Sequence, residues 1–188
     1  MDEINQVLFP LWNLSPQAPG WLVGLARWVS GVLTNVAVLA VFATLARPGP
    51  WRRLGWQMLL ALALAWLVAR GIHTAWPQPR PFMLGQGQQW IMHSPSASFP
   101  SRHATIGMAF GLTGLLAAPR RWVGVLCLLA GLLIGWSRVA LGVHFPLDVL
   151  AGWAIAGVVA LAVHLVWRHW VVPAPLPTIC AGRPSRHR

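Results

Sequence analysis

The sequence contains very few carboxylates, no lysine and no tyrosine. Asp and Glu together number three, and only Asp148 lies outside the first three positions. Metal-dependent phosphatases hold their ions with several carboxylate oxygens, and glycosidase-type acid–base catalysis needs a carboxylate pair. The two cysteines, Cys127 and Cys180, have no partner at metal-ligand spacing. We therefore expect no metal site and no other cofactor.

Charge is scarce throughout the chain. Only 9% of the residues are charged, whereas 56% are hydrophobic, and soluble domains carry roughly 25% charged residues. The chain is therefore predicted to be a membrane protein. Its formal charge of +11 comes entirely from arginines spread between apolar stretches. A nucleic-acid binder gathers its basic residues on a soluble face, so nucleic acid is excluded as a partner.

Hydropathy predicts an all-α, polytopic membrane bundle with about five transmembrane helices and an N-terminal interfacial helix. The predicted spans are 21–46, 54–73, 103–118, 122–141 and 147–170. Residues 1–14 alternate apolar and polar side chains at helical spacing, which is typical of a helix in the membrane interface. A poorly formed sixth crossing is the alternative. Residues 1–170 would form the membrane domain, and 171–188 a disordered, basic, cytoplasmic tail.

Arginine is concentrated on one predicted side of the membrane. The connections after the first and third spans and the C-terminal region carry most of it: Arg47, Arg52, Arg53, Arg120, Arg121, Arg168, Arg183, Arg186 and Arg188. The positive-inside rule places this side in the cytoplasm. The N-terminus and the loops 74–102 and 142–146 are then expected to face outward.

Three polar clusters lie at the outward ends of the predicted spans: residues 73–81, 100–103 and 137–148. In these clusters, Arg80 and Arg138 offer planar guanidinium donors that match phosphate oxygens. Ser101 lies where a helix N-cap is expected, and a helix start with free amides attracts anions. The clusters offer nothing that suits a cation. The expected ligand is an anion, with phosphate as the leading candidate.

Two histidines in these clusters can supply chemistry. A neutral imidazole attacks phosphorus if its second nitrogen is held by a partner, and Asp148 follows His144 by four positions. Pro146 suits the first turn of a helix, which would leave His144 just outside that helix. His103 is placed to donate a proton to the leaving oxygen.

These motifs together resemble the three-part signature of the type 2 phosphatidic acid phosphatase superfamily. The matching residues are Arg80-Pro81, Pro100-Ser101-x-His103 and Ser137-Arg138-x5-His144-x3-Asp148. The stretches 99–105 and 143–149 are most similar to bacterial undecaprenyl pyrophosphate phosphatases associated with bacitracin resistance. The resemblance implies an enzyme of the bacterial inner (plasma) membrane whose active site faces the periplasm or the outside.

The same resemblance implies specific roles for the site residues. His144 would form a phosphohistidine, Asp148 would orient it, and His103 would act as general acid. The remaining site residues would hold the substrate phosphate: Arg80, Ser101, Arg102, Arg138 and His73. His73 stands where the family usually has lysine, and Arg102 stands where glycine or aspartate is common.

The expected activity is metal-independent hydrolysis of a lipid phosphate or diphosphate, with undecaprenyl diphosphate as the leading substrate. Phosphatidylglycerophosphate or phosphatidic acid hydrolysis is the alternative within this class. A non-catalytic lipid-phosphate binder or carrier is the alternative from another class. The small-residue motifs Gly107-x3-Gly111 and Gly131-x3-Gly135 are attributed to packing within one chain, and they predict no oligomeric state. His93 is interpreted as an interfacial side chain.

Overall fold

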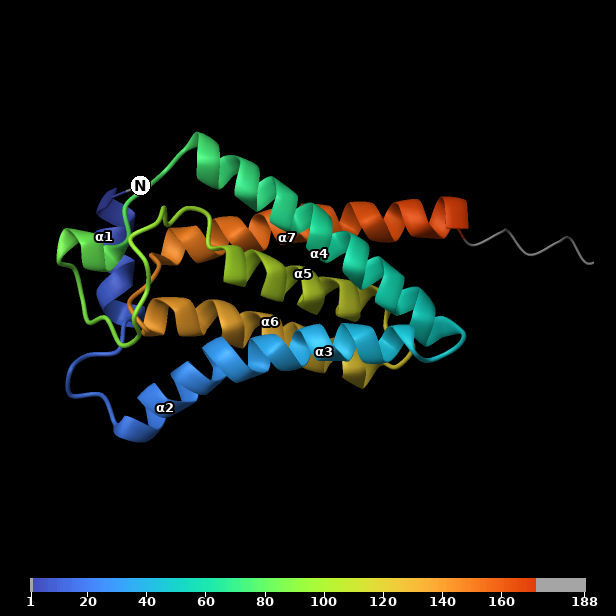
Figure 1. Ribbon diagram of the computed structural model, residues 1–188, viewed down its shortest axis with the longest axis horizontal. Helices are drawn as coiled ribbons and strands as arrows, with labels where there is room; N and C mark the ends of the chain where they lie inside the picture. Colours follow the sequence, from blue (N-terminus) through green and yellow to red (C-terminus); the bar gives the residue numbers. More distant parts are fainter. Residues whose placement is uncertain (1, 172–188) are drawn as a thin grey trace, which may run out of the picture.

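The protein is a bundle of long helices with a short helix and a long loop across one end (Figure 1). The computed structural model describes residues 2–171, and every regular element in that part is helical. In chain order these are α1 (Asp2–Trp12), α2 (Gly20–Trp28), η1 (Val29–Leu33), α3 (Thr34–Leu45), α4 (Pro50–Ala75), η2 (Pro81–Leu84), α5 (Arg102–Ala117), α6 (Arg121–Ala140), α7 (Pro146–Val166) and η3 (Trp167–Val171). The predicted all-α class is confirmed.

Within residues 2–171, four helical segments are long and apolar enough to cross a membrane: Gly20–Leu45, Pro50–Ala75, Arg121–Ala140 and Pro146–His169. Each matches a predicted span to within a few residues. The remaining predicted span corresponds to α5, which has 16 residues and is shorter than the roughly 20 that a full crossing needs. The chain is a multi-pass membrane protein. Of the predicted tail, only Val171 belongs to the described part, and residues 172–188 lie outside it.

The short helix α5 lies in the middle of the bundle, where it contacts α4, α6 and α7 (Figure 1). Most of its residues are buried against these neighbours. Glycine allows the close approach of α6: a Cβ added at Gly131 would lie 2.6 Å from the carbonyl oxygen of Gly107. Gly107, Gly111 and Gly131 thus pack α5 against α6, while Gly135 packs against Trp153 of α7. The small-residue motifs serve packing within one chain, as predicted.

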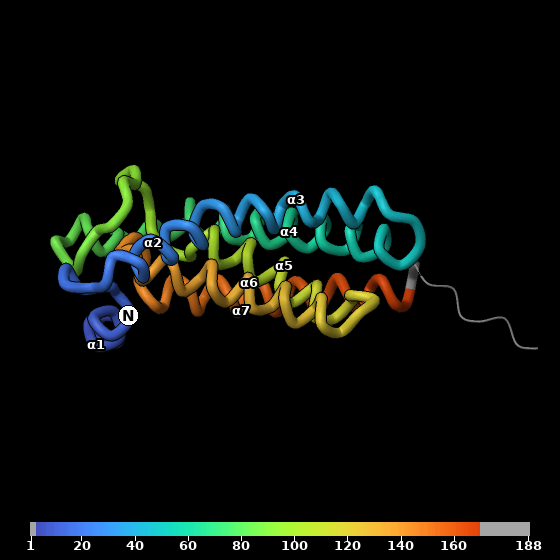
Figure 2. Tube along the Cα trace, turned by 90° about the horizontal axis from the view of Figure 1, so that it is seen from below, coloured from blue at the N-terminus to red at the C-terminus, as the bar shows by residue number. Residues whose placement is uncertain are grey.

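Helix α1 lies across the end of the bundle rather than along it, as two perpendicular views show (Figures 1 and 2). Its 11 residues span only about 16 Å at 1.5 Å per residue, roughly half the thickness of the hydrocarbon core. Phe9 is buried, whereas Ile4, Val7 and Leu11 are exposed on its other face. These features support the interfacial helix over a sixth crossing.

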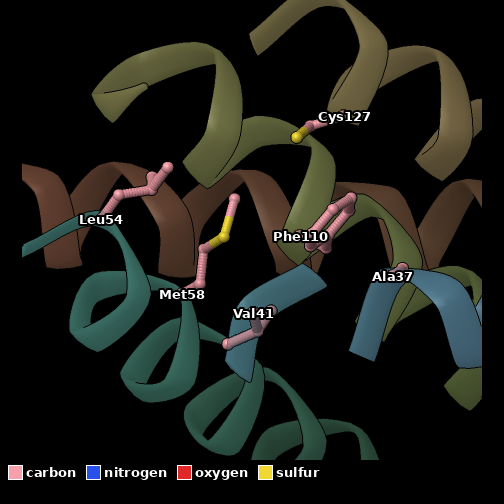
Figure 3. Close-up of a cluster of buried hydrophobic side chains, with 6 residues drawn as sticks. All are labelled: Ala37, Val41, Leu54, Met58, Phe110 and Cys127. Atoms are coloured by element: carbon pink, nitrogen blue, oxygen red, sulfur yellow. The ribbon is translucent and has the colours of Figure 1, made fainter. Parts of the chain in front are cut away.

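The two ends of the bundle differ in composition. The α3–α4 and α5–α6 connections and the end of α7 lie at one end (Figure 1). Six of the arginines that were assigned to a single side belong to this end: Arg47, Arg52, Arg53, Arg120, Arg121 and Arg168. The other three, Arg183, Arg186 and Arg188, lie outside the described residues. Helix α1, the loop between α4 and α5, and the α6–α7 turn lie at the other end, called the site end below. An apolar cluster fills the half away from the site end (Figure 3): Ala37, Val41, Leu54, Met58, Phe110 and Cys127.

Candidate active site

The site end brings together the starts of α5 and α7, the end of α6 and the loop between α4 and α5. Ser101 is the N-cap of α5, and its hydroxyl accepts from the amide of Ala104 at 3.5 Å. The amides of Arg102 and His103 have no intrahelical acceptor, as at any helix start. The main chain of Ser101 donates to the carbonyl of Asp148 at 3.0 Å. This bond joins the beginnings of α5 and α7.

His144 lies immediately before α7, and its ring is almost completely buried. The helix begins at Pro146, as predicted. The Asp148 carboxylate lies 3.5 Å from Nδ1 of His144, and the same carboxylate oxygen accepts from the amide of Phe145 at 2.8 Å. Asp148 therefore caps the first turn of α7 and faces the histidine that precedes it.

Ser98 completes this arrangement, and the sequence analysis did not select it. Its hydroxyl donates to Asp148 at 2.5 Å and lies 3.2 Å from Nδ1 of His144. The side chain is fully buried. Because the Ser98 hydroxyl donates its hydrogen bond to Asp148, its oxygen can accept a hydrogen bond from Nδ1–H of His144. Ser98 thus bridges the histidine and the carboxylate.

Arg80 approaches the other side of the His144 ring. Its Nη1 lies 3.0 Å from Nε2 of His144, and an arginine can only donate. Nε2 is therefore the acceptor, and the ring proton lies on Nδ1. Burial lowers the pKa of His144 well below its ordinary value, and the nearby charges of Arg80 and Arg138 lower it further. His144 is neutral at pH 7, with its lone pair on Nε2.

The five N–H donors of Arg80 all have acceptors. Besides His144, they reach Val143 O at 2.8 Å, Ser96 O at 2.9 Å, Ser96 Oγ at 3.2 Å and Ala97 O at 3.0 Å. Burial lowers the pKa of Arg80 to about 10, opposed by the charge of Asp148, so the side chain stays cationic at neutral pH. Arg80 also fixes the loop against the α6–α7 turn. Ser96 is a second contact that sequence analysis did not select.

Arg138 is the second buried guanidinium. Its Nη1 donates to Ser30 at 2.5 Å, and Ser30 belongs to the π-helical turn η1 inside the first span. Its buried Nε has no partner within residues 2–171. In that part of the chain, no carboxylate forms a salt bridge with Arg80 or Arg138. Two buried cations without a paired carboxylate make a strongly anion-attracting site.

The other predicted residues surround these groups. His103 is exposed and lies within electrostatic reach of Arg138 and His93. His73, near the end of α4, and Arg102, at the start of α5, are partly exposed and lie within electrostatic reach of each other. The structure thus brings all eight predicted site residues to one end of the bundle. Their roles stay predictions.

Asn13, which follows α1, supports the site from outside. Its side chain donates to Gln88 O at 3.0 Å and Ala140 O at 3.2 Å, and it accepts from Gln88 N at 2.7 Å. The adjacent Gly142 has φ +74°, and a Cβ there would lie 2.1 Å from Gln88 O. Only glycine fits this contact. The clamp holds the loop against the turn that carries His144.

The anion-attracting site formed by Arg80 and Arg138 is defined by charge rather than by the volume of a cavity. A cavity of about 500 Å³ lies between the α1 region and residues 86–88, and none of the predicted site residues lines it. The buried guanidiniums, the neutral imidazole and the α5 start instead lie together beside the exposed His103. This arrangement suits a small anionic group presented from the surface.

Comparison with known proteins identifies the family. The model of the PAP2 superfamily matches residues 54–171, which contain all eight predicted site residues. The chain belongs to the PAP2 superfamily. The resemblance inferred from the three motifs is confirmed.

Named relatives agree with this family. The chain is 33% identical to the putative undecaprenyl-diphosphatase YbjG of Escherichia coli over 89% of its length and 85% of that protein. It is 31% identical to an undecaprenyl-diphosphatase of Sulfolobus acidocaldarius over 80% of its length and 72% of that protein. The crystal structure of Aquifex aeolicus LpxE is similar with a TM-score of 0.67 and 25% identity, covering 85% of this chain and 94% of that one. This PAP2 protein is a lipid phosphatase.

Proposed function

We propose that the enzyme hydrolyses undecaprenyl diphosphate to undecaprenyl phosphate through a phosphohistidine on His144. The observation that carries this proposal is a neutral, buried imidazole beside two buried guanidiniums that have no carboxylate salt bridge within residues 2–171. The likeness to two undecaprenyl-diphosphatases over most of the chain supports this substrate.

In the proposed first step, Nε2 of His144 attacks the terminal phosphorus. The new N–P bond forms as the bridging P–O bond breaks, and lipid monophosphate leaves. In the structure, Nη1 of Arg80 donates a hydrogen bond to Nε2 of His144. The incoming phosphate must accept this N–H instead, which frees the lone pair of Nε2 for attack. Ser98 and Asp148 hold Nδ1–H and stabilise the positive charge that develops on the ring.

Phosphate oxygens would be held by donors on several elements. Arg138 offers its unpartnered Nε, and the start of α5 offers the amides of Arg102 and His103. The partly exposed side chains of Arg102 and His73 would contact the phosphate from the solvent side of the site. These donors stabilise the extra charge of the transition state more than that of the ground state.

His103 would take up a proton as the anionic substrate binds, protonate the leaving oxygen and then activate water. Water attacks the phosphohistidine, the N–P bond breaks, inorganic phosphate leaves and His144 returns to its neutral form. When the substrate is a diphosphate, the leaving group is a lipid phosphate, which needs less protonation than the lipid alkoxide that leaves from a monophosphate. His103→Ala should therefore reduce hydrolysis of a lipid monophosphate more than that of a diphosphate.

The deciding experiment is an assay of the purified protein against undecaprenyl diphosphate, phosphatidylglycerophosphate and phosphatidic acid. The proposal expects the highest kcat/KM for the diphosphate, full activity in excess EDTA and inhibition by vanadate, whose pentacoordinate form mimics the transition state. Activity lost in EDTA and restored by magnesium would contradict the mechanism. A clear preference for either phospholipid would overturn the proposed substrate and leave the chemistry intact.

We further propose that the site faces the periplasm or exterior of a bacterial inner membrane, because the arginine-rich connections lie at the opposite end. Met92, which is 97% exposed at the site end, and Pro119, which is exposed in the α5–α6 connection, are suitable reporters. In a variant with Cys127→Ala and Cys180→Ala, Met92→Cys should react with an impermeant thiol reagent in intact cells. Pro119→Cys should react only after lysis, and the reverse pattern would refute the orientation.

A further inference from the structure

His93 lies against the proposed nucleophile. The His93 and His144 rings meet edge to face, with centroids 6.4 Å apart and planes at 77°. His93 comes from the loop between α4 and α5 and is partly exposed. The interpretation of this residue as an interfacial side chain missed this contact. His93 also lies within electrostatic reach of His103, so it is close to both proposed catalytic histidines.

The surroundings of His93 are cationic. Burial lowers its pKa below the ordinary value, and the charges of Arg80, Arg138 and Arg102 lower it further, while the carbonyl of Ser94 opposes this shift. Nδ1 lies 3.0 Å from that carbonyl and donates to it in the neutral ring. Nε2 then carries a lone pair. Without an anion, His93 is therefore neutral and offers Nε2 only as an acceptor.

A bound phosphate favours the protonated form of His93 over the neutral form. An anion among Arg80, Arg138 and Arg102 offsets the repulsion that disfavours a proton on His93. Proton uptake turns Nε2 into a charged donor, while Nδ1–H keeps its bond to Ser94. Charge-assisted bonds to phosphate are roughly twice as strong as neutral ones. A diphosphate carries more negative charge than a monoester and favours this change more.

We infer that His93 determines specificity by binding the second, departing phosphate of a diphosphate substrate. The position suits this role, because His93 contacts the ring of the attacking histidine and lies within electrostatic reach of the histidine proposed to serve the leaving group. The inference rests on the proposed diphosphatase function. It assigns the choice between diphosphate and monophosphate to one loop residue, separately from the guanidiniums that hold the phosphoryl group under attack.

The test compares farnesyl diphosphate with farnesyl monophosphate, which share a lipid chain and differ by one phosphate. His93→Phe keeps the ring and removes its nitrogens. We expect the ratio of kcat/KM values, diphosphate over monophosphate, to fall about 10- to 100-fold, the range for losing a charged hydrogen bond. His93→Lys, which restores a charged donor, should recover most of the ratio. His93→Gln keeps an uncharged donor and should give an intermediate ratio even if the Phe variant does not fold.

Met92→Ala is the matched control, since it alters the same loop at a side chain that is 97% exposed, and its ratio should equal that of the unaltered enzyme. An equal loss for both substrates in His93→Phe would overturn the inference and assign the ring to supporting His144. An unchanged ratio would overturn it as well. An unaltered enzyme that hydrolyses only the monophosphate would refute the proposed diphosphatase function together with this inference.

Discussion

The two halves of the bundle are stabilised in different ways. At the site end, buried polar side chains bind one another and main-chain groups through directional hydrogen bonds, as Arg80, Ser98 and Asp148 do. In the opposite half, apolar side chains and glycines pack closely between α3, α4, α5 and α6 (Figure 3). Hydrogen-bond geometry orients reacting groups, whereas close packing determines helix separation. Substitutions in the first region should therefore change chemistry, and those in the second should change stability.

The largest effect is expected for His144→Ala at the site end. Loss of the nucleophile should reduce kcat by about 10⁴-fold or more and abolish acid-labile labelling of the protein by a ³²P-labelled substrate. The helical fold, measured by circular dichroism, should persist. His164→Ala, a change of the same residue type on α7 far from the site, should keep normal turnover. Near-normal hydrolysis by His144→Ala would contradict the phosphohistidine mechanism and favour the binder alternative.

Asp148→Asn tests whether the carboxylate acts on the histidine or only caps α7. An amide oxygen still accepts from Phe145, but the amide cannot balance imidazolium charge and favours the wrong tautomer. We expect kcat to fall about 10³-fold, with little change in the unfolding midpoint. A large stability loss with a normal rate per folded molecule would instead show that Asp148 serves only as a cap.

Ser98→Ala removes the bridge between His144 and Asp148 while leaving both in place. Losing this neutral positioning contact should lower kcat about tenfold and leave KM within about twofold. Steady-state kinetics separates the two parameters, and Ser98→Cys should restore part of kcat. If KM rises and kcat is unchanged, Ser98 contributes to substrate binding rather than to orientation of the histidine.

The smallest effect on activity is expected for Gly124→Ala in the opposite half. The added Cβ would lie 2.9 Å from both Gly114 O and Leu115 Cα, and these backbone atoms cannot rotate away. The free energy of unfolding should fall by about 1–3 kcal/mol, with kcat within about twofold. The matched control is Gly157→Ala, where the nearest atom would be Leu112 Cδ1 at 3.8 Å. If Gly124→Ala lowers kcat without lowering stability, the assignment of chemistry to the site end and stability to the opposite half is wrong.

Local patterns in the sequence determined the positions of the helices and of the principal site residues. The apolar runs predicted the membrane spans. Ser101 predicted where α5 begins, and Pro146 predicted where α7 begins. These features depend on residues within a few positions of one another, so hydropathy and capping preferences are sufficient to detect them. The order of the three motifs was enough to indicate the family.

Tertiary structure alone decided the long-range partners of the site residues. Ser30 reaches Arg138 across 108 positions, and Ser98 reaches His144 across 46. Neither serine belongs to a local pattern that marks it, because the loop between α4 and α5 has no periodicity and Ser30 lies inside an apolar span. The contact between His93 and His144 is equally non-local. Such contacts depend on how the helices pack and how the loop folds over them, and these arrangements are determined by the whole bundle rather than by any segment.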